Sequence, residues 1–415
     1  MASGTHQAIE AIWRIEQAKI IAGVARITRD VGIAEELAQD ALVTALNRWP
    51  QQGIPDNPAA WLMTAAKNRA LDERRRARLI ERKHEEIGRE MDEHDTPDPD
   101  AALDDDIGDD LLRLIFTSCH PVLSTEARVA LTLRLIGGLT TEEIARAFLM
   151  PEATVAQRIV RAKRTLTEAR VPFEVPRGAA LDERLASVLE VIYLIFNEGY
   201  AATAGEDWVR PALCEEALRL GRILAELAPA EPEVHGLVAL MEIQASRLGA
   251  RTAPDGAPIL LLEQNRARWD QLLIRRGLAA LVRAERLEAE RGPYVLQAAI
   301  AACHARARTA DATNWARIAE IYGELAERTP SPVIELNRAV AVSMAQGPAA
   351  GLELVDALTA EPTLKNYHLL PSVRGDFLKK LGRTAEARAE FERAAALTQN
   401  ARERKLLLDR AAALG

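Results

Sequence analysis

Apolar residues recur every three or four positions along most of the chain, which is the spacing of one buried helix face. The pattern predicts one long helix or two short ones over residues 9–29, a second helix over 34–49 and a third over roughly 59–83. A loop at 50–58, which contains glycine, proline, aspartate and asparagine, separates the second helix from the third. Because alanine, leucine, arginine and glutamate also dominate the composition, the predicted fold class is all-α.

The segment LTTEEIARAFLMPEATVAQRIVRAKRTL, residues 139–166, has the pattern of a helix-turn-helix. Thr140 and Glu143 form a capping box that begins the first helix, and Thr154 is expected to cap the second. Apolar residues of the second helix point inward, at Val155, Ile159, Ala162 and Leu166. Its outer face carries groups that pair with base edges and phosphates in a DNA major groove, namely Thr154, Gln157, Arg158, Arg161, Lys163 and Arg164. An ordinary helical hairpin with a solvated basic face is the alternative interpretation.

The third predicted helix carries a second set of polar residues on one face. Asn68, Asp72, Arg75 and Arg76 stand at i, i+4, i+7 and i+8, with Lys67 beside them. A basic helix next to a polar loop suits nucleic acid that must be held open, because cations follow the backbone and a loop can hold an unstacked base. A solvated, salt-bridged helix end is the alternative. On the second helix the outward residues are Glu36, Gln39 and Asp40. They fit two interpretations, contact with a basic protein surface or ordinary solvation.

Charge is segregated along the chain, although the formal net charge is only −8. Residues 67–83 contain eight basic and three acidic residues, whereas residues 85–110 contain thirteen acidic residues and one basic residue. Dense like charge with few apolar residues predicts a flexible linker. We therefore divide the chain into residues 1–84, an acidic linker at 85–108, and a helix-turn-helix block at 109–171.

Beyond residue 172 the chain is predicted to be helical throughout, first as an extension over 172–290 and then as repeats over 291–415. Gly347 and Gly382 are 35 residues apart, and each separates two helical patterns. In the last unit Gly375, Ala387, Phe391 and Ala394 occupy the positions where a tetratricopeptide repeat needs small and aromatic residues. Residues 293–327 suggest a further helical hairpin.

Several functional classes find no support in the sequence. We expect no enzyme, because no phosphate loop, catalytic triad or spaced metal-ligand set occurs, and we expect neither a cofactor nor a metal. The three cysteines are far apart, which argues against a disulfide framework. No run of about 18 apolar residues occurs, so we expect no membrane partner and a cytoplasmic protein.

Two segments together resemble an extracytoplasmic-function sigma factor of the sigma-70 family. AEELAQDALVTALNRW with NPAAWLMTAAKNRALDERRRAR looks like region 2 of that family, and LSTEARVALTLRLIGGLTTEEIARAF with ATVAQRIVRAKRTL looks like region 4. The acidic linker replaces a region 3 domain. FTSCHP at 116–121, LIFNEGYAA at 194–202 and LLLEQNRARWD at 260–270 are similar to signatures of a subgroup with a long C-terminal helical extension.

The resemblance implies partners and roles. Core RNA polymerase and promoter DNA would be the partners, and Glu36, Gln39 and Asp40 would contact the clamp helices of the largest polymerase subunit. Asn57 in the 50–57 loop would hold a flipped base of the −10 element, and Lys67, Asn68, Asp72, Arg75 and Arg76 would bind and help melt that region. Gln157, Arg158, Arg161 and Arg164 would read the −35 element. One departure is Ala153, where many relatives have glycine before the recognition helix.

The role of the extension is less constrained by the sequence. Glu263, Arg266 and Trp269 belong to a polar and aromatic cluster that would contact the sigma modules or a ligand, or would simply begin a helix with a buried tryptophan. We hypothesise that the extension regulates the sigma modules in cis. The competing functions are a helix-turn-helix regulator that acts without polymerase, and a helical-repeat scaffold.

Overall fold

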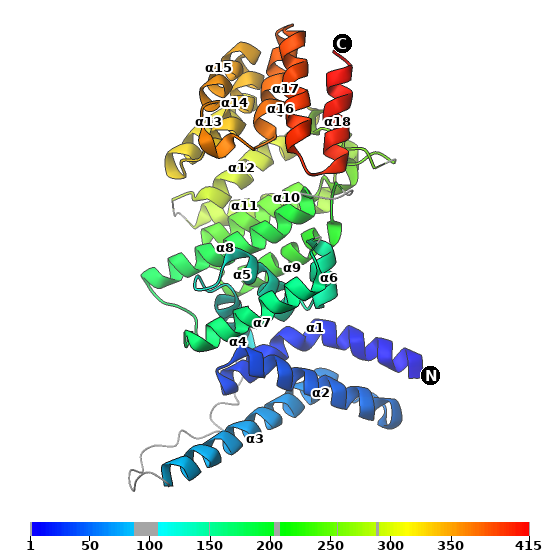
Figure 1. Ribbon diagram of the computed structural model, residues 1–415, viewed down its shortest axis with the longest axis vertical. Coiled ribbons are helices and arrows are strands. Elements are labelled where there is room, and N and C mark those ends of the chain that lie inside the picture. Colours follow the sequence, from blue (N-terminus) through cyan, green and yellow to red (C-terminus); the bar gives the residue numbers. More distant parts are fainter. Residues whose placement is uncertain are drawn as a thin grey trace. The chain divides into compact units, whose positions relative to one another are not determined.

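The computed structural model describes residues 2–86, 107–148, 150–202, 208–254, 256–287 and 290–414. Within these ranges every regular element is a helix, apart from one bridge that pairs Thr252 with Pro258. The chain divides into two compact units, Met1–Val191 and Ile192–Gly415. The expected all-α class is therefore confirmed (Figure 1).

Three helices begin the first unit and pack on one another: α1 (Ala2–Thr28), α2 (Val31–Gln52) and α3 (Pro58–Glu86). Asp30 begins α2, because its side chain accepts hydrogen bonds from the backbone N–H groups of Gly32 and Ile33 at 2.7 and 3.0 Å. The inner side of α2 is buried at Ala34, Ala38, Ala41, Ala45 and Trp49. The small side chains of the four alanines let α1 and α3 approach α2 closely.

The loop after α2 is shorter than the sequence pattern indicated. The helix continues through Pro50 to Gln52, and Gly53 ends it at φ 87° with its N–H bonded to the Trp49 carbonyl at 2.9 Å. Pro50 removes one N–H from the last turns, which the helix tolerates, while the positive φ at Gly53 is what stops it. Asn57 then caps α3, since its side-chain oxygen accepts the Ala60 N–H at 3.1 Å.

The rest of the first unit holds α4 (Ile107–Ser118), α5 (Thr125–Leu135), α6 (Thr141–Ala147), α7 (Glu152–Glu168) and the start of α8 (Ala179–Tyr200). Leu114, Leu131, Leu133 and Leu135 are fully buried at its centre. Helix α4 packs against both α1 and α5. The expected acidic linker lies almost wholly outside the described residues.

The second unit continues α8 and contains ten further α-helices within its described residues. They are α9 (Pro211–Leu227), α10 (Pro232–Ala245), α11 (Gln271–Arg286), α12 (Pro293–Arg306), α13 (Trp315–Arg328), α14 (Pro332–Gln346), α15 (Pro348–Leu358), α16 (Leu369–Lys380), α17 (Thr384–Leu397) and α18 (Ala401–Ala412). Short 3₁₀ turns lie at Leu248–Ala250 (η2), Leu261–Glu263 (η3), Arg266–Arg268 (η4) and Pro362–Leu364 (η5).

The repeat pattern appears as helix pairs. Gly347 joins α14 to α15 at φ 104°, and Gly382 joins α16 to α17 at φ 77°. Gly375 faces Phe391, whose ring would be 2.9 Å from a Cβ at that position, so the close approach of α16 and α17 requires a glycine. Both glycine joints and the small-to-aromatic contact lie at the positions named from the sequence, while the tetratricopeptide-like repeat stays a prediction.

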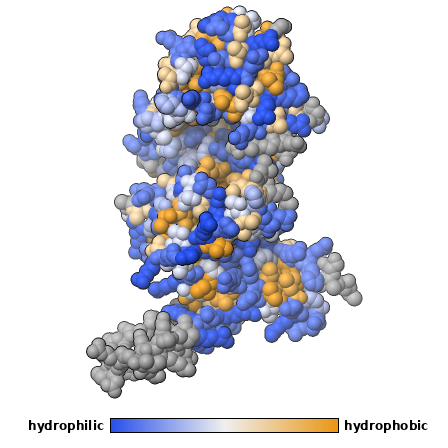
Figure 2. Space-filling view, in the orientation of Figure 1, coloured by the Kyte–Doolittle hydropathy of each residue, from blue (hydrophilic) through white to orange (hydrophobic). Residues whose placement is uncertain are grey.

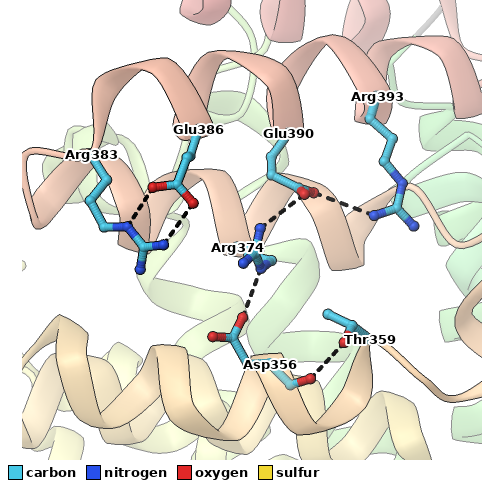
Figure 3. Close-up of polar contacts among 7 residues, drawn as sticks. All are labelled: Asp356, Thr359, Arg374, Arg383, Glu386, Glu390 and Arg393. Atoms are coloured by element: carbon cyan, nitrogen blue, oxygen red, sulfur yellow. Dashed lines mark hydrogen bonds and ion pairs between the residues drawn. The ribbon is translucent and has the colours of Figure 1, made fainter.

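An ion-pair network joins neighbouring helices of this segment (Figure 3). Arg374 on α16 donates to Asp356 on α15 at 2.8 Å and to Glu390 on α17 at 3.0 Å. Its guanidinium therefore links three successive helices.

None of the described helices is both long enough and apolar enough to cross a membrane.

Candidate nucleic-acid interface

The helix-turn-helix forms with one change at its second helix. The capping box is present, because Thr140 N–H donates to Glu143 Oε2 at 2.8 Å and Glu143 N–H donates to Thr140 Oγ1 at 3.1 Å. The expectation that Thr154 caps the second helix is wrong, since α7 begins at Glu152 with Pro151 at its N-cap. The Pro151 carbonyl accepts the Thr154 N–H at 3.0 Å, which commits Thr154 to the first turn. Ala153 is helical, so no glycine is needed there.

The two faces of α7 differ as the sequence pattern indicated. Val155, Ile159, Ala162 and Leu166 are buried, and the helix packs against α5 and α6. Burial of this stripe holds the opposite face outward, which is the condition for contact with a DNA groove.

Four of the predicted reading residues line one open groove. Thr154, Gln157, Arg158 and Arg161 border a groove of about 360 Å³ that also includes Ser124 at the start of α5. The positive end of the α5 dipole therefore lies beside the two guanidinium groups, which favours an anion such as a backbone phosphate. Arg164 lies outside this groove and is paired with Glu168 at 2.6 Å on the exposed side of α7.

Lys163 is placed differently from the other predicted reading residues. Its ammonium group forms an ion pair with Glu35 on α2, a residue only 4% exposed. The same carboxylate accepts a hydrogen bond from Arg134 Nε at 2.7 Å and one from Gln39 Nε2 at 2.9 Å. A buried carboxylate with two hydrogen bonds and two cationic neighbours is a fixed anchor between α2, α5 and α7.

The outer face of α2 combines acidic and apolar groups. Glu36 and Asp40 are exposed, as predicted, whereas Gln39 is half-buried and bonded to Glu35. Ile33 and Val43 lie on the same face as the two acids, at spacings of three or four residues, and are 41% and 53% exposed. Figure 2 shows orange patches in the region of α1 and α2. Sequence reasoning missed Ile33 and Val43, although both fall outside the inner stripe of α2.

Helix α3 presents its predicted polar face to solvent. Asn68, Asp72, Arg75 and Arg76 are all exposed, and Asp72 forms a 3.6 Å pair with Arg75. Lys67 is half-buried, and its charge acts on Asp110. Burial raises the pKa of Asp110, and the charges of Arg26 and Arg113 oppose that rise without overcoming it.

Asn57 and Trp61, at the start of α3, both make contacts within the fold. Asn57 is exposed, but its side-chain oxygen is occupied in capping α3. Trp61 contacts Trp49 edge to face, with ring centroids 5.3 Å apart, and is half-buried as a core residue. The side-chain oxygen of Asn57 thus serves the start of α3.

The first turns of α8 are hydrogen-bonded to the helix-turn-helix block. Arg184 Nη2 donates to the Phe116 carbonyl at 2.7 Å, and Ser187 Oγ donates to the Cys119 carbonyl at 2.6 Å. Arg128 on α5 pairs with Glu190 at 3.1 Å. Backbone carbonyls of the segment FTSCHP therefore accept hydrogen bonds from α8 side chains. The side chains of the segment give no indication of this role.

Cys119 and His120 in this segment fit a structural role. Burial raises the pKa of the Cys119 thiol to about 11, and its sulfur lies 3.3 Å from Thr132 Oγ1. Burial and the nearby Arg184 charge lower the pKa of His120 to about 4. Among the described residues no group of three or more histidine, cysteine or acidic side chains could hold a metal.

The predicted cluster in the extension does not form one surface. Glu263 is exposed, whereas Trp269 is only 4% exposed and precedes Asp270, which caps α11. Arg266 donates to the carbonyls of His304 and Ala307, both at 2.7 Å. The geometry favours a helix start with a buried tryptophan over a shared contact surface.

Comparison with known proteins agrees with this organisation. Residues 14–80 match Sigma-70 region 2, residues 113–166 match Sigma-70 region 4, and residues 184–285 match a family of unknown function (DUF6596). An uncharacterised protein of Rhizobium meliloti (strain 1021) is 44% identical over 379 residues, which cover 91% of this chain and 89% of the relative.

Two named relatives match a smaller share of the chain. ECF RNA polymerase sigma factor SigL of Mycobacterium tuberculosis is 32% identical over 142 residues, covering 34% of this chain and 76% of SigL. The probable ECF RNA polymerase sigma factor SigI of the same organism is 27% identical over 166 residues, covering 40% of this chain and 57% of SigI.

Proposed function

Because this chain belongs to the extracytoplasmic-function RNA polymerase sigma factors, which direct promoter recognition, we propose how its helices divide that task. Helix α2 binds core RNA polymerase, α3 and the loop before it bind and open the −10 element, and α7 reads the −35 element. The chain acts by binding and not by catalysis. The observation that carries this proposal is the open groove along α7, with Gln157, Arg158 and Arg161 on its border.

The −35 contact combines sequence reading with phosphate binding. Gln157 and Arg158 offer the amide and guanidinium groups that pair with adenine and guanine edges. Arg161 lies one helical turn further on, at the position where a groove-bound helix meets the DNA backbone. Lys163 supports the helix through Glu35 and does not read bases.

The −10 contact follows from the exposed face of α3. Arg75 and Arg76 supply cations for the backbone, and Asn68 and Asp72 supply hydrogen-bonding groups for unstacked bases. The amide of Asn57 lies at the start of the same helix, where it can meet a flipped base. Tethering the two DNA modules raises the effective concentration of the second once the first is bound.

The polymerase contact is assigned to the outer face of α2. Glu36 and Asp40 provide charge for a basic surface, while Ile33 and Val43 provide apolar area that water leaves on binding. Mixed faces of this kind are typical of protein interfaces. Exposed acids alone fit ordinary solvation equally well, so Ile33 and Val43 strengthen the proposal that this face contacts a protein.

We further propose that the extension acts on the sigma modules in cis. Arg184 and Ser187 belong to the segment that matches the family of unknown function, yet both are bonded to carbonyls of α4 and the residue after it. The extension therefore begins in direct contact with the helix-turn-helix block. A conformational change in the extension would reach α5 through the Arg128–Glu190 pair.

In vitro transcription with purified core polymerase tests both proposals. The full chain should form a promoter complex with the polymerase, and Arg158→Ala should reduce transcription from a −35-dependent promoter. Arg184→Ala combined with Ser187→Ala should alter promoter activity without loss of polymerase binding. If the full chain binds no core polymerase, the sigma mechanism is refuted. If the double variant and a truncation after residue 175 both match the full chain, only regulation in cis is refuted.

A further inference from the structure

Helix α7 is attached to the first turn of α2 by two polar contacts. Lys163 forms its ion pair with the buried Glu35, and Thr167 Oγ1, one helical turn further along α7, donates to Asp30 Oδ2 at 2.6 Å. Asp30 is also the residue that begins α2. All four residues lie in the first compact unit. The proposed reader of the −35 element is therefore held directly against the helix assigned to polymerase.

Further polar pairs join the first three helices to the helix-turn-helix block. Gln17 on α1 packs against Gly138, between α5 and α6, so closely that a Cβ at Gly138 would lie 1.8 Å from the Gln17 amide nitrogen. Helix α4 packs against α1, where Arg26 faces Asp110 at 3.5 Å. Polar pairs of this kind can exchange their partners for water when two blocks separate, at a smaller cost than a purely apolar interface.

The two DNA-binding helices lie too close together in this arrangement to serve one promoter. Lys163 meets Glu35 on α2, and Arg69 on α3 donates to Thr44 at 2.5 Å, nine residues further along α2. Nine residues of helix rise about 14 Å, so with the reach of the side chains Lys163 and Arg69 lie within about 40 Å of each other. The rest of the exposed face of α3, as far as Arg76, adds about 10 Å. The −35 and −10 elements are about 25 base pairs apart, which is about 85 Å of B-DNA. A chain that occupies both elements must therefore separate α7 from α2.

The contact between α2 and α7 borders the face of α2 that is assigned to polymerase. A Cβ at Gly32 would lie 3.7 Å from Lys163 Cδ, and the next residue, Ile33, belongs to that face. Gln39, a predicted polymerase contact, donates to Glu35 at 2.9 Å. A protein that covers Ile33 therefore approaches Lys163, and one that binds Gln39 removes a donor from Glu35. Because both effects favour the separated form, polymerase binding shifts the equilibrium toward it.

We propose that Asp30 and Glu35 on α2, with Thr167 and Lys163 on α7, form a latch that keeps the −35 reader on α2 in the free chain, and that core RNA polymerase opens this latch when it binds α2. Resting on the proposed function, the latch adds an order of events: polymerase binds first and the promoter second. The closed latch lowers the affinity of the free chain for promoter DNA, because only the separated fraction can bind both elements.

An engineered disulfide that holds the latch closed tests whether it must open. In the full chain with Gly32→Cys and Lys163→Cys, the Cβ at position 32 would lie 3.9 Å from the Cβ of residue 163, which is within the range that a disulfide spans. The chain oxidised before mixing should support at least tenfold less promoter-dependent transcription by core polymerase than the same chain after reduction. Gly32→Cys alone, treated in the same way, should show no difference. Equal transcription by the oxidised and reduced double variant, with the disulfide verified by mass spectrometry, overturns the proposal.

Promoter binding in the absence of polymerase provides an independent test. The DNA probe carries both elements, and mismatches leave its −10 region unpaired. Lys163→Met should bind this probe at least tenfold more tightly than the unaltered chain, although it has lost a cation, and should gain nothing on a probe with the −35 element alone. Arg48→Met, which removes an exposed cation from α2, should show no gain on either probe. An unchanged affinity of Lys163→Met for the probe with both elements overturns the latch.

Failure of the latch and failure of the proposed function give different results. If the unaltered chain forms no promoter complex with core polymerase, the proposed function fails and the latch fails with it. If that complex forms, but the disulfide leaves transcription unchanged and Lys163→Met leaves promoter binding unchanged, the latch alone is refuted.

Discussion

Glu35→Gln should loosen the contact between α2 and α7. The substitution keeps the size and one acceptor oxygen of the side chain, but it removes the negative charge that faces Arg134 and Lys163. Glu35 is nearly fully buried, whereas the two cations have side chains that are 25% and 22% exposed. Water can therefore solvate the cations only in part once the carboxylate is gone.

The expected cost follows from these contacts. A hydrogen bond to a charged group contributes about 1 kcal/mol more than a neutral one, and two such bonds to Glu35 lose their charge assistance. Breaking a fully buried ion pair costs about 3–5 kcal/mol, which the partial exposure of both cations reduces. We therefore expect Glu35→Gln to destabilise the contact by about 2–3 kcal/mol.

Native-state hydrogen exchange measured by mass spectrometry can locate this effect. Amides of α7 should exchange roughly 30- to 150-fold faster in Glu35→Gln, which is the free-energy loss expressed as a ratio. Glu36→Gln is the matched control, because it makes the same chemical change at an exposed position of the same helix. If α7 exchanges equally fast in both variants, Glu35 is not an anchor and the reasoning fails.

Three further outcomes are expected. Arg161→Met should reduce by about one unit the slope of the logarithm of the promoter-binding constant against the logarithm of salt concentration. Lys163→Met should leave this slope unchanged. Equal slopes in the two variants would place both cations on DNA. In thermal unfolding, Gly323→Ala should stabilise the protein by about 0.5–1 kcal/mol, because Gly323 on α13 faces open space. Gly351→Ala should destabilise the protein, because its Cβ would lie 2.9 Å from the Ala339 carbonyl oxygen. A stabilising Gly351→Ala together with a destabilising Gly323→Ala would contradict the helix packing. Burial opposes ionisation of Glu403, but hydrogen bonds from a histidine and a threonine outweigh it and hold its pKa below the usual 4.5. Its contribution to stability is present above that value and lost as pH falls through the lower folded pKa, so melting temperature should fall less steeply with acid in Glu403→Gln.

Local patterns in the sequence were sufficient to predict the helices and the faces that they bury. The capping box at Thr140 and Glu143, the inner stripe of α7 and the glycine joints at Gly347 and Gly382 all depend on neighbours within one or two helical turns. Such interactions are encoded by spacing alone, so they can be read without knowing the fold. The same holds for the exposed polar face of α3.

The tertiary structure alone decided which distant residues meet. Lys163 has the same charge as Arg161, yet Glu35 is more than a hundred positions away in the sequence, and no periodicity predicts that the two pair. The hydrogen bonds from Arg266 to the carbonyls of His304 and Ala307 are equally invisible to local spacing. Burial and charge compensation depend on what the fold brings within a few ångströms, which local spacing does not specify.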